Sequence, residues 1–216
     1  QWLCAYPIFQ DNRVYRPYHL KHHRFTETKD DPDLSLSEPF PIKKDSFYRK
    51  IFRDLTGITG YKRYSQALNS ILNTEAKNSK EKLNKVWHKV HGFLITNTII
   101  FFMISIFFHW SLFFLLWWLP AFTYYSLIIR IRNIAEHSVT PGNNNFDNTR
   151  TTLTNPLVRF LMAPHRVNYH LEHHLFMMCP WYNLPKAHSM MIENGYEDRM
   201  CIANSYRSVL MKAVSA

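Results

Sequence analysis

The chain has 216 residues, of which 46% are hydrophobic and 19% are charged, with 11 prolines, 5 glycines and 3 cysteines. This composition excludes a disordered tail, a collagen-like fibre and a disulfide-stapled scaffold. Lysine and arginine outnumber aspartate and glutamate by 26 to 16, and this net charge of +10 is compatible with either a nucleic-acid partner or an anionic lipid surface.

A histidine-rich motif lies near the N-terminus, where His19, His22 and His23 follow the pattern His-x-x-His-His. At about 100° per residue, these side chains lie at roughly 0°, 300° and 40° on a helix, so one face presents three imidazoles to a common centre. An acidic loop that contains proline follows, and its acids are either solvated or partners that fix the second ring nitrogen of a histidine ligand. The candidates in this loop are Glu27, Asp30 and Asp31.

A basic, helix-prone stretch connects this motif to the most apolar part of the chain. Residues 46–58 place apolar side chains at helical spacing, a pattern shared by interfacial helices and ordinary surface helices. The 40 residues from Gly92 to Ile131 would extend about 60 Å as a helix, twice the ~30 Å hydrocarbon core of a bilayer. Because His109-Trp110-Ser111 separates two apolar runs, the sequence predicts a transmembrane helical hairpin over residues 92–131.

The charges that flank the hairpin predict its orientation. Five lysines between Lys77 and Lys89 precede it, and Arg130 and Arg132 follow it. Positively charged loops favour the cytoplasmic side, so we expect both ends of the hairpin, and with them the histidine motifs, to face the cytoplasm. Anionic lipid headgroups are then the expected counterpart of the net positive charge, and nucleic acid is not.

A second group of candidate ligands follows the hairpin directly. Asn133 and His137 are four residues apart and therefore share one face of a helix. Glu136 borders this face, as either a ligand or a partner that orients one.

The first motif recurs near the C-terminus, where His170, His173 and His174 repeat the pattern His-x-x-His-His. Two chance copies are expected in well under about one in a thousand sequences of this histidine content. Glu172 lies at roughly 200° from His170 on a helical wheel and should point away from the imidazoles. Histidines outside the motifs are expected to be surface or interfacial residues without a ligand role, namely His88, His91, His109, His165 and His188.

The number of imidazoles indicates how many metal ions the site binds. Imidazole binds zinc, copper, iron and nickel, so the ligand type alone does not name the metal. A structural zinc takes four protein ligands and a catalytic zinc three, so the candidate histidines exceed what one ion uses and fit two. We therefore expect an all-α membrane bundle with a transmembrane hairpin and a cytoplasmic helical cap that holds a dimetal site. The predicted metal ligands are the histidines His19, His22, His23, His137, His170, His173 and His174.

The motifs lie in longer strings that resemble the membrane fatty acid desaturases over nearly the whole chain. The strings run over residues 19–33, 168–176 and 180–186. The segment with Asn133 and His137 resembles the ligand segment after the hairpin of acyl-CoA desaturases, where the asparagine holds one iron through water. The strings look most similar to a bacterial subgroup that includes desaturases of rhizobitoxine-type biosynthesis. This resemblance implies that residues 1–216 form one desaturase domain.

The resemblance also implies an activity in lipid metabolism and fatty acid biosynthesis. It implies two Fe²⁺ ions, dioxygen as co-substrate, and a double bond introduced into a fatty acyl chain carried as a lipid, an acyl-CoA or an acyl-carrier thioester. Because the sequence shows no haem-attachment or flavin motif, electrons are expected from a separate protein such as a ferredoxin or a small haem protein. The expected location is a bacterial inner membrane.

One departure from the family pattern concerns the N-terminus. The family's first histidine motif lies a few tens of residues before the second, but only 18 residues precede His19. The sequence therefore predicts an N-terminally truncated chain that is inactive alone.

Two other functions share parts of this pattern. A membrane hydroxylase or ketolase has the same histidine motifs, and ligand spacing does not separate it from a desaturase. A metal transporter is the weaker alternative, because transporters place polar ligands within their spans. Here the predicted hairpin contains a single histidine, His109, near its turn.

Overall fold

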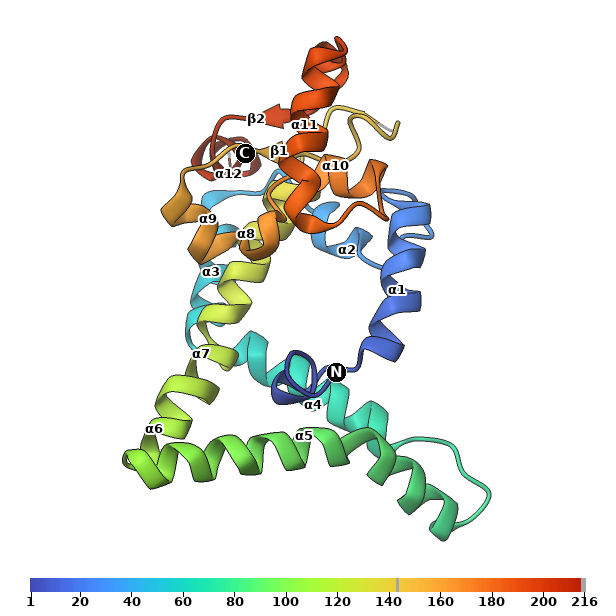
Figure 1. Cartoon of the computed structure of the whole chain (residues 1–216), viewed down its shortest axis with the longest axis vertical. Helices are drawn as coiled ribbons and strands as arrows, with labels where there is room; N and C mark the ends of the chain where they lie inside the picture. The colour runs from blue at the N-terminus through green and yellow to red at the C-terminus, as the bar shows by residue number, and fades with distance from the viewer. Residues whose placement is uncertain (143, 215–216) are drawn as a thin grey trace. The chain divides into compact units, whose positions relative to one another are not determined.

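The computed structural model describes residues 1–142 and 144–214 and is all-α apart from two short strands (Figure 1). The α-helices are α1 (Asn12–Phe25), α2 (Leu34–Ser37), α3 (Lys44–Leu55), α4 (Ile58–Leu72), α5 (Ser79–Phe107), α6 (Ser111–Phe113), α7 (Leu119–Phe122), α8 (Tyr124–His137), α9 (Pro156–Met162), α10 (His170–Leu175), α11 (Leu184–Glu193) and α12 (Tyr206–Ala213). Short 3-10 turns are η1 (Tyr6–Ile8), η3 (Pro164–Arg166), η4 (Trp181–Asn183) and η5 (Glu197–Arg199), and η2 (Phe114–Trp118) is a π-helical turn. The strands are β1 (Thr151–Thr152) and β2 (Ile202–Ala203).

The chain divides into two compact units. One comprises Gln1–Tyr18 and Lys50–Leu127, and the other comprises His19–Arg49 and Ile128–Ala216. The first unit contains the turn of the predicted hairpin, and the second contains both histidine motifs.

The predicted hairpin and the position of its turn are confirmed. The first arm is α5, which begins after Asn78, whose side chain accepts a hydrogen bond from the backbone N–H of Glu81 at 2.8 Å. The chain becomes helical again at Ser111 and continues to His137. Both arms are long and apolar enough to cross a membrane, and only 17% and 11% of their apolar windows are buried. Core helices of soluble proteins are mostly buried, so this exposure suits contact with lipid.

Aromatic contacts and one shared carbonyl join the two arms within the first unit. The rings of Phe93 and Trp118 lie 5.7 Å apart, and those of Phe101 and Phe113 lie 5.4 Å apart. The carbonyl of Pro7 accepts from the side-chain amide of Asn97 at 3.2 Å and from the indole N–H of Trp117 at 3.4 Å. The N-terminal segment thus supplies an acceptor for a polar side chain of each arm.

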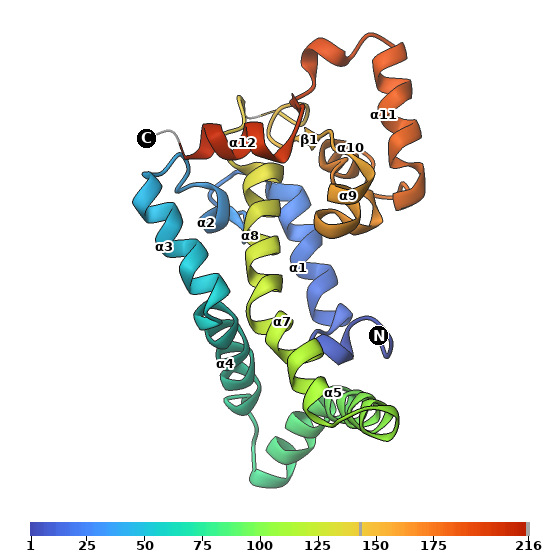
Figure 2. The same cartoon turned by 90° about the vertical axis from the view of Figure 1, so that its left-hand side faces the viewer.

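Three small apolar clusters form the core of the second unit. Ile134 and Ala135, neighbours near the end of α8, are both almost fully buried and belong to different clusters. The end of α8 is therefore enclosed on two sides, and α12 lies across it (Figure 2). The clusters centre on Phe40, Ile134, Val209 and Ala213, on Ala135, Ala163 and Tyr206, and on Leu171, Met191 and Met200.

A short sheet connects the segments that follow α8 to those around α10. β1 pairs with β2 in parallel, with Thr151 opposite Ile202, and Thr151 also forms an antiparallel bridge with Tyr169. Since Tyr169 directly precedes α10, this sheet fixes where α10 begins.

A glycine allows α4 to approach α7 closely in the first unit. The helical segment expected over residues 46–58 ends at Leu55, and Gly57 adopts a left-handed φ of 80° before α4 starts. A Cβ atom at Gly60 would collide with the backbone of Phe122. Glycine at this position therefore permits contact between the backbones of the two helices.

We predict that Gly60→Ala lowers the thermal stability of the protein in detergent. In an open helix this change would stabilise by about 1 kcal/mol through helix propensity, but overpacking costs about 1–3 kcal/mol. A fall in Tm of a few degrees is expected. Gln66→Ala, on the exposed side of the same helix, is the control, and a rise in Tm for Gly60→Ala would contradict the close contact.

Candidate metal centre

The second unit brings seven predicted histidine ligands together from three helices. The end of α1 carries His19, His22 and His23, the last residue of α8 is His137, and α10 carries His170, His173 and His174. Their ligand nitrogens gather into two groups, in each of which these atoms lie within 4.8 Å of one another. We call these the four-histidine group (His22, His137, His170, His174) and the three-histidine group (His19, His23, His173).

Each motif contributes to both groups. His19 and His23 join the three-histidine group, whereas His22 joins the four-histidine group. The second motif does the reverse, since its first and last histidines join the four-histidine group and His173 joins the other. All three histidines of a motif share one helix face, but relative to the first the histidine at i+4 is turned by about 40° in one direction and the histidine at i+3 by about 60° in the other, so the two can reach different groups. The sequence predicted one common centre for each motif, and the structure instead divides each motif between two centres.

In the three-histidine group, hydrogen bonds alone do not satisfy all the close contacts between ring nitrogens. The Nε2 atoms of His19, His23 and His173 are 3.0, 3.1 and 3.3 Å apart in pairs. A neutral Nε2 either carries a proton or offers a lone pair, so at least one of three mutual contacts joins two atoms of the same kind. Imidazole nitrogens that bind one ion at about 2.1 Å, with angles of roughly 90–110°, lie about 3.0–3.4 Å apart. These residues therefore fit one metal ion.

The four-histidine group is equally crowded and more deeply buried. Nε2 of His170 lies 2.8 Å from Nε2 of His137 and 3.1 Å from Nε2 of His174. The Nδ1 atoms of His137 and His170 are buried and have no hydrogen-bond partner among the described residues. The convergence of these Nε2 atoms on one another fits a second metal ion.

Burial keeps the imidazoles in the form that binds metal. Burial, together with a smaller effect of the neighbouring histidines, lowers the pKa of His19 to about 4 and that of His23 to about 3. Burial also lowers the pKa of His170 and His174 well below the usual value for histidine. A neutral ring offers its lone pair without first releasing a proton, so these side chains are ready to bind metal near neutral pH.

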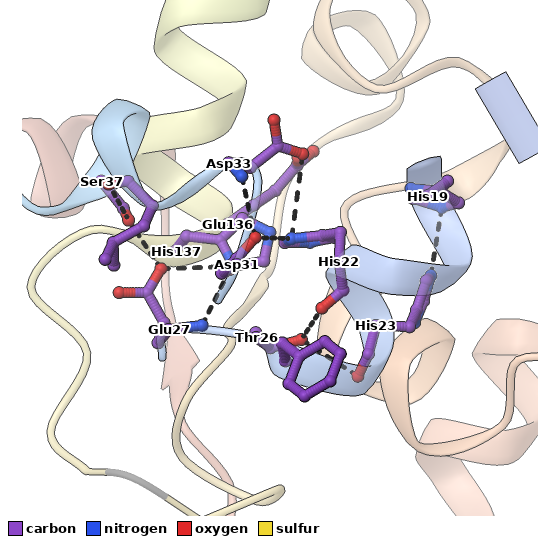
Figure 3. Close-up of polar contacts among 12 residues, drawn as sticks. His19, His22, His23, Thr26, Glu27, Asp31, Asp33, Ser37, Glu136 and His137 are labelled. Atoms are coloured by element: carbon purple, nitrogen blue, oxygen red, sulfur yellow. Dashed lines mark hydrogen bonds and ion pairs between the residues drawn. The ribbon is translucent and has the colours of Figure 1, made fainter. Parts of the chain in front are cut away.

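Asp31 orients one ligand. Its buried carboxylate accepts from Nδ1 of His22 at 2.8 Å and from the backbone N–H groups of Glu27 and Asp33, both at 2.8 Å (Figure 3). Burial raises the pKa of Asp31, but these hydrogen bonds outweigh burial and lower it. For His22, burial lowers the pKa, but the bond to Asp31 and nearby carboxylates outweigh burial and raise it. With Nδ1 bound to Asp31, Nε2 of His22 remains available to a metal, as in carboxylate–histidine–metal arrangements.

Two other predicted acids lie beside the imidazoles, and one does not. An oxygen of Glu27 is 3.8 Å from Nδ1 of His137, and an oxygen of Glu136 is 4.0 Å from Nε2 of His170. Burial raises the pKa of the Glu27 carboxyl, and a cation bound in the cluster would favour the charged forms of both acids. Asp30 is exposed at the surface, which fits the second possibility considered for the acids of this loop, a solvated side chain.

Asn133 lies in α8 one helical turn before His137 and is partly buried. Its predicted role, binding one iron through water, stays a prediction.

The contact of Glu172 was not predicted from the sequence. Glu172 points away from the imidazoles, as the helical wheel predicted, but it is fully buried and accepts hydrogen bonds from the hydroxyl of Thr151 and, at 2.6 Å, from Nδ1 of His188. His188, expected to have no ligand role, lies outside both histidine groups, but it contacts the second motif through this bond to Glu172. The sequence did give one indication of this contact, because an acid on the core side of an amphipathic helix requires a hydrogen-bond partner.

Comparison with known families agrees with the geometry. The profile of a family described as fatty acid desaturase matches residues 1–202. The chain belongs to the fatty acid desaturase family. No curated protein and no solved structure matches the chain. The matched range contains all seven clustered histidines, and a dimetal site is typical of this desaturase family.

We predict that Asp31→Ala weakens metal binding by about 10–100-fold, the usual effect of losing a partner that orients a histidine ligand. A chelator competition followed by elemental analysis measures the loss. Asp30→Ala, the same change at the adjacent exposed residue, should leave affinity unchanged. Equal affinities for the two variants would contradict the role of Asp31.

Proposed function

We propose that the chain is an oxygen-dependent di-iron membrane desaturase that introduces a double bond into a fatty acyl chain. The observation that carries this proposal is the pair of imidazole groups, drawn reciprocally from two histidine motifs, in a chain of the fatty acid desaturase family. We assign one iron to the four-histidine group and the other to the three-histidine group, with Asn133 as a ligand through water.

The residues of the proposed site have different roles. When bound, the two irons would supply the activation of dioxygen and the removal of two hydrogens from adjacent carbons. The three imidazoles of the three-histidine group would hold one ion and would leave it able to bind a small ligand. The surrounding carboxylates orient the rings, and burial of the four-histidine group keeps bulk water away from its side of the site.

The hairpin supports a membrane setting for this reaction. Its exposed apolar side chains, such as Ile106 and Phe107, suit a hydrocarbon environment in which an acyl chain also dissolves. We propose that both ends of the hairpin and both motifs face the cytoplasm of a bacterial inner membrane. We further propose that residues 1–216 act as one desaturase domain of the rhizobitoxine-type subgroup, and that a ferredoxin or small haem protein supplies electrons.

A hydroxylase or ketolase with the same metal ligands is the alternative function, and the mass of the product distinguishes it from a desaturase. Desaturation lowers the mass of the acyl chain by two units, and hydroxylation raises it by sixteen. Mass analysis of the acyl products of an expressing host, with the substrate carried as lipid, acyl-CoA or acyl-carrier thioester, therefore distinguishes them.

We predict about two irons per chain in the protein purified under low oxygen, because seven imidazoles exceed the ligand capacity of one ion. Elemental analysis measures the content. One zinc per chain with no iron would reject the assignment.

We also predict that His22→Ala, His137→Ala and His173→Ala each abolish acyl desaturation in the full-length protein, because each removes an imidazole that converges on one of the groups. Gas chromatography of total acyl chains from the host gives the readout. Glu172→Gln should keep part of the activity, because a glutamine carbonyl still accepts a hydrogen bond. His88→Ala, at an exposed position of α5, is the matched control, and full activity of His22→Ala would refute the ligand assignment.

A further inference from the structure

A polar segment between α8 and α10 is almost completely buried. Asn148, Thr149, Arg150, Thr151 and Thr152 are at most 7% exposed. Polar side chains are costly to bury unless they form hydrogen bonds, so the bonds that this segment makes indicate its purpose.

Arg150 binds the C-terminal end of α8. Its guanidinium donates to the carbonyls of Ala135 at 3.1 Å, Ser138 at 3.0 Å and Val139 at 2.7 Å, and its backbone N–H donates to the carbonyl of Glu136 at 2.9 Å. The last carbonyls of a helix lack partners within the helix, and a cation there is favoured by the helix dipole. These bonds surround His137, the last residue of α8, on both sides in sequence.

The next residue, Thr151, binds α10. Its hydroxyl donates to Glu172, which lies between the ligands His170 and His174. The backbone reinforces this link, because the N–H of Thr152 donates to the carbonyl of Asn168 at 2.9 Å and the side chain of Asn168 donates back at 3.1 Å. One peptide bond therefore separates the residue that fixes α8 from the residue that fixes α10.

We propose that Arg150 and Thr151 are positioning residues that set the spacing between His137 and α10, and so shape the four-histidine group to accept its metal. The contact that they control is the 2.8 Å approach of His137 to His170, ligands from helices far apart in sequence. This inference rests on the proposed metal site. Neither residue touches the metal, and each acts through hydrogen bonds that fix a helix bearing ligands.

The segment contains its own controls. Thr149 and Thr152 are as deeply buried as Thr151, but their hydroxyls have no hydrogen-bond partner among the described residues. Replacing either by valine preserves size and removes a hydroxyl that binds nothing. The same change at Thr151 removes the bond to Glu172.

The test is a Co²⁺ titration of the metal-free full chain in detergent micelles, followed by visible absorption of the bound ion. We expect Thr151→Val to weaken one of two Co²⁺ sites by about 10–100-fold and to alter the absorption band of that site. Thr151→Ser should restore both affinity and spectrum, because the hydroxyl returns. Thr149→Val should match the unsubstituted protein. If Thr151→Val does not fold, Thr151→Cys, with a thiol that donates only weakly, takes its place.

Three outcomes would overturn the inference. Unchanged Co²⁺ affinity in Thr151→Val would show that the bond to Glu172 does not position the ligands. Equal losses in Thr151→Val and Thr149→Val would show an effect of packing alone. Absence of two Co²⁺ sites in the unsubstituted chain would overturn the proposed dimetal function as well, and this separates the two failures.

Discussion

Mutual contact of imidazole nitrogens is the constraint on which the second unit depends. The ligand nitrogens of seven rings gather in two groups, in each of which they lie within 4.8 Å of one another, and burial keeps most of these rings neutral. In the three-histidine group, three mutual contacts of 3.0–3.3 Å are more than one proton per ring satisfies. Two bound cations would resolve the conflict. The surrounding contacts suit this requirement, since Asp31 accepts from the His22 ring, Arg150 binds the end of α8, and Glu172 in α10 accepts from Thr151 and His188.

Features that depend on local periodicity were predictable from the sequence. The hairpin turn lies at His109-Trp110-Ser111 because amphipathic and polar residues interrupt the apolar runs there. The two histidine motifs are helical and turn their imidazoles toward one cluster because residues three and four apart share a helix face. Glu172 points away for the same geometric reason. The prediction of an all-α fold is confirmed on these grounds.

Features that depend on contacts between distant segments were not predictable. A helical wheel places His22 beside His19 and His23 but does not show that His22 joins ligands from α8 and α10. It also gives no reason to pair His188 with Glu172, because the partner lies on a different helix. Arg150 resembles any loop arginine until the end of α8 is placed against it. Each of these partners is determined by tertiary packing and not by the local sequence pattern.

The reciprocal exchange between the motifs has a consequence for biosynthesis. Each metal group takes ligands from residues near position 20 and from residues near position 170, and one contact alone spans 150 residues. A nascent chain that has reached only the hairpin therefore possesses neither site in finished form. In the proposed dimetal site, loading of both metals would therefore wait until α10 has been made and has docked, so the two ions would enter late and as a linked pair, and a fault at either motif would deprive the protein of both.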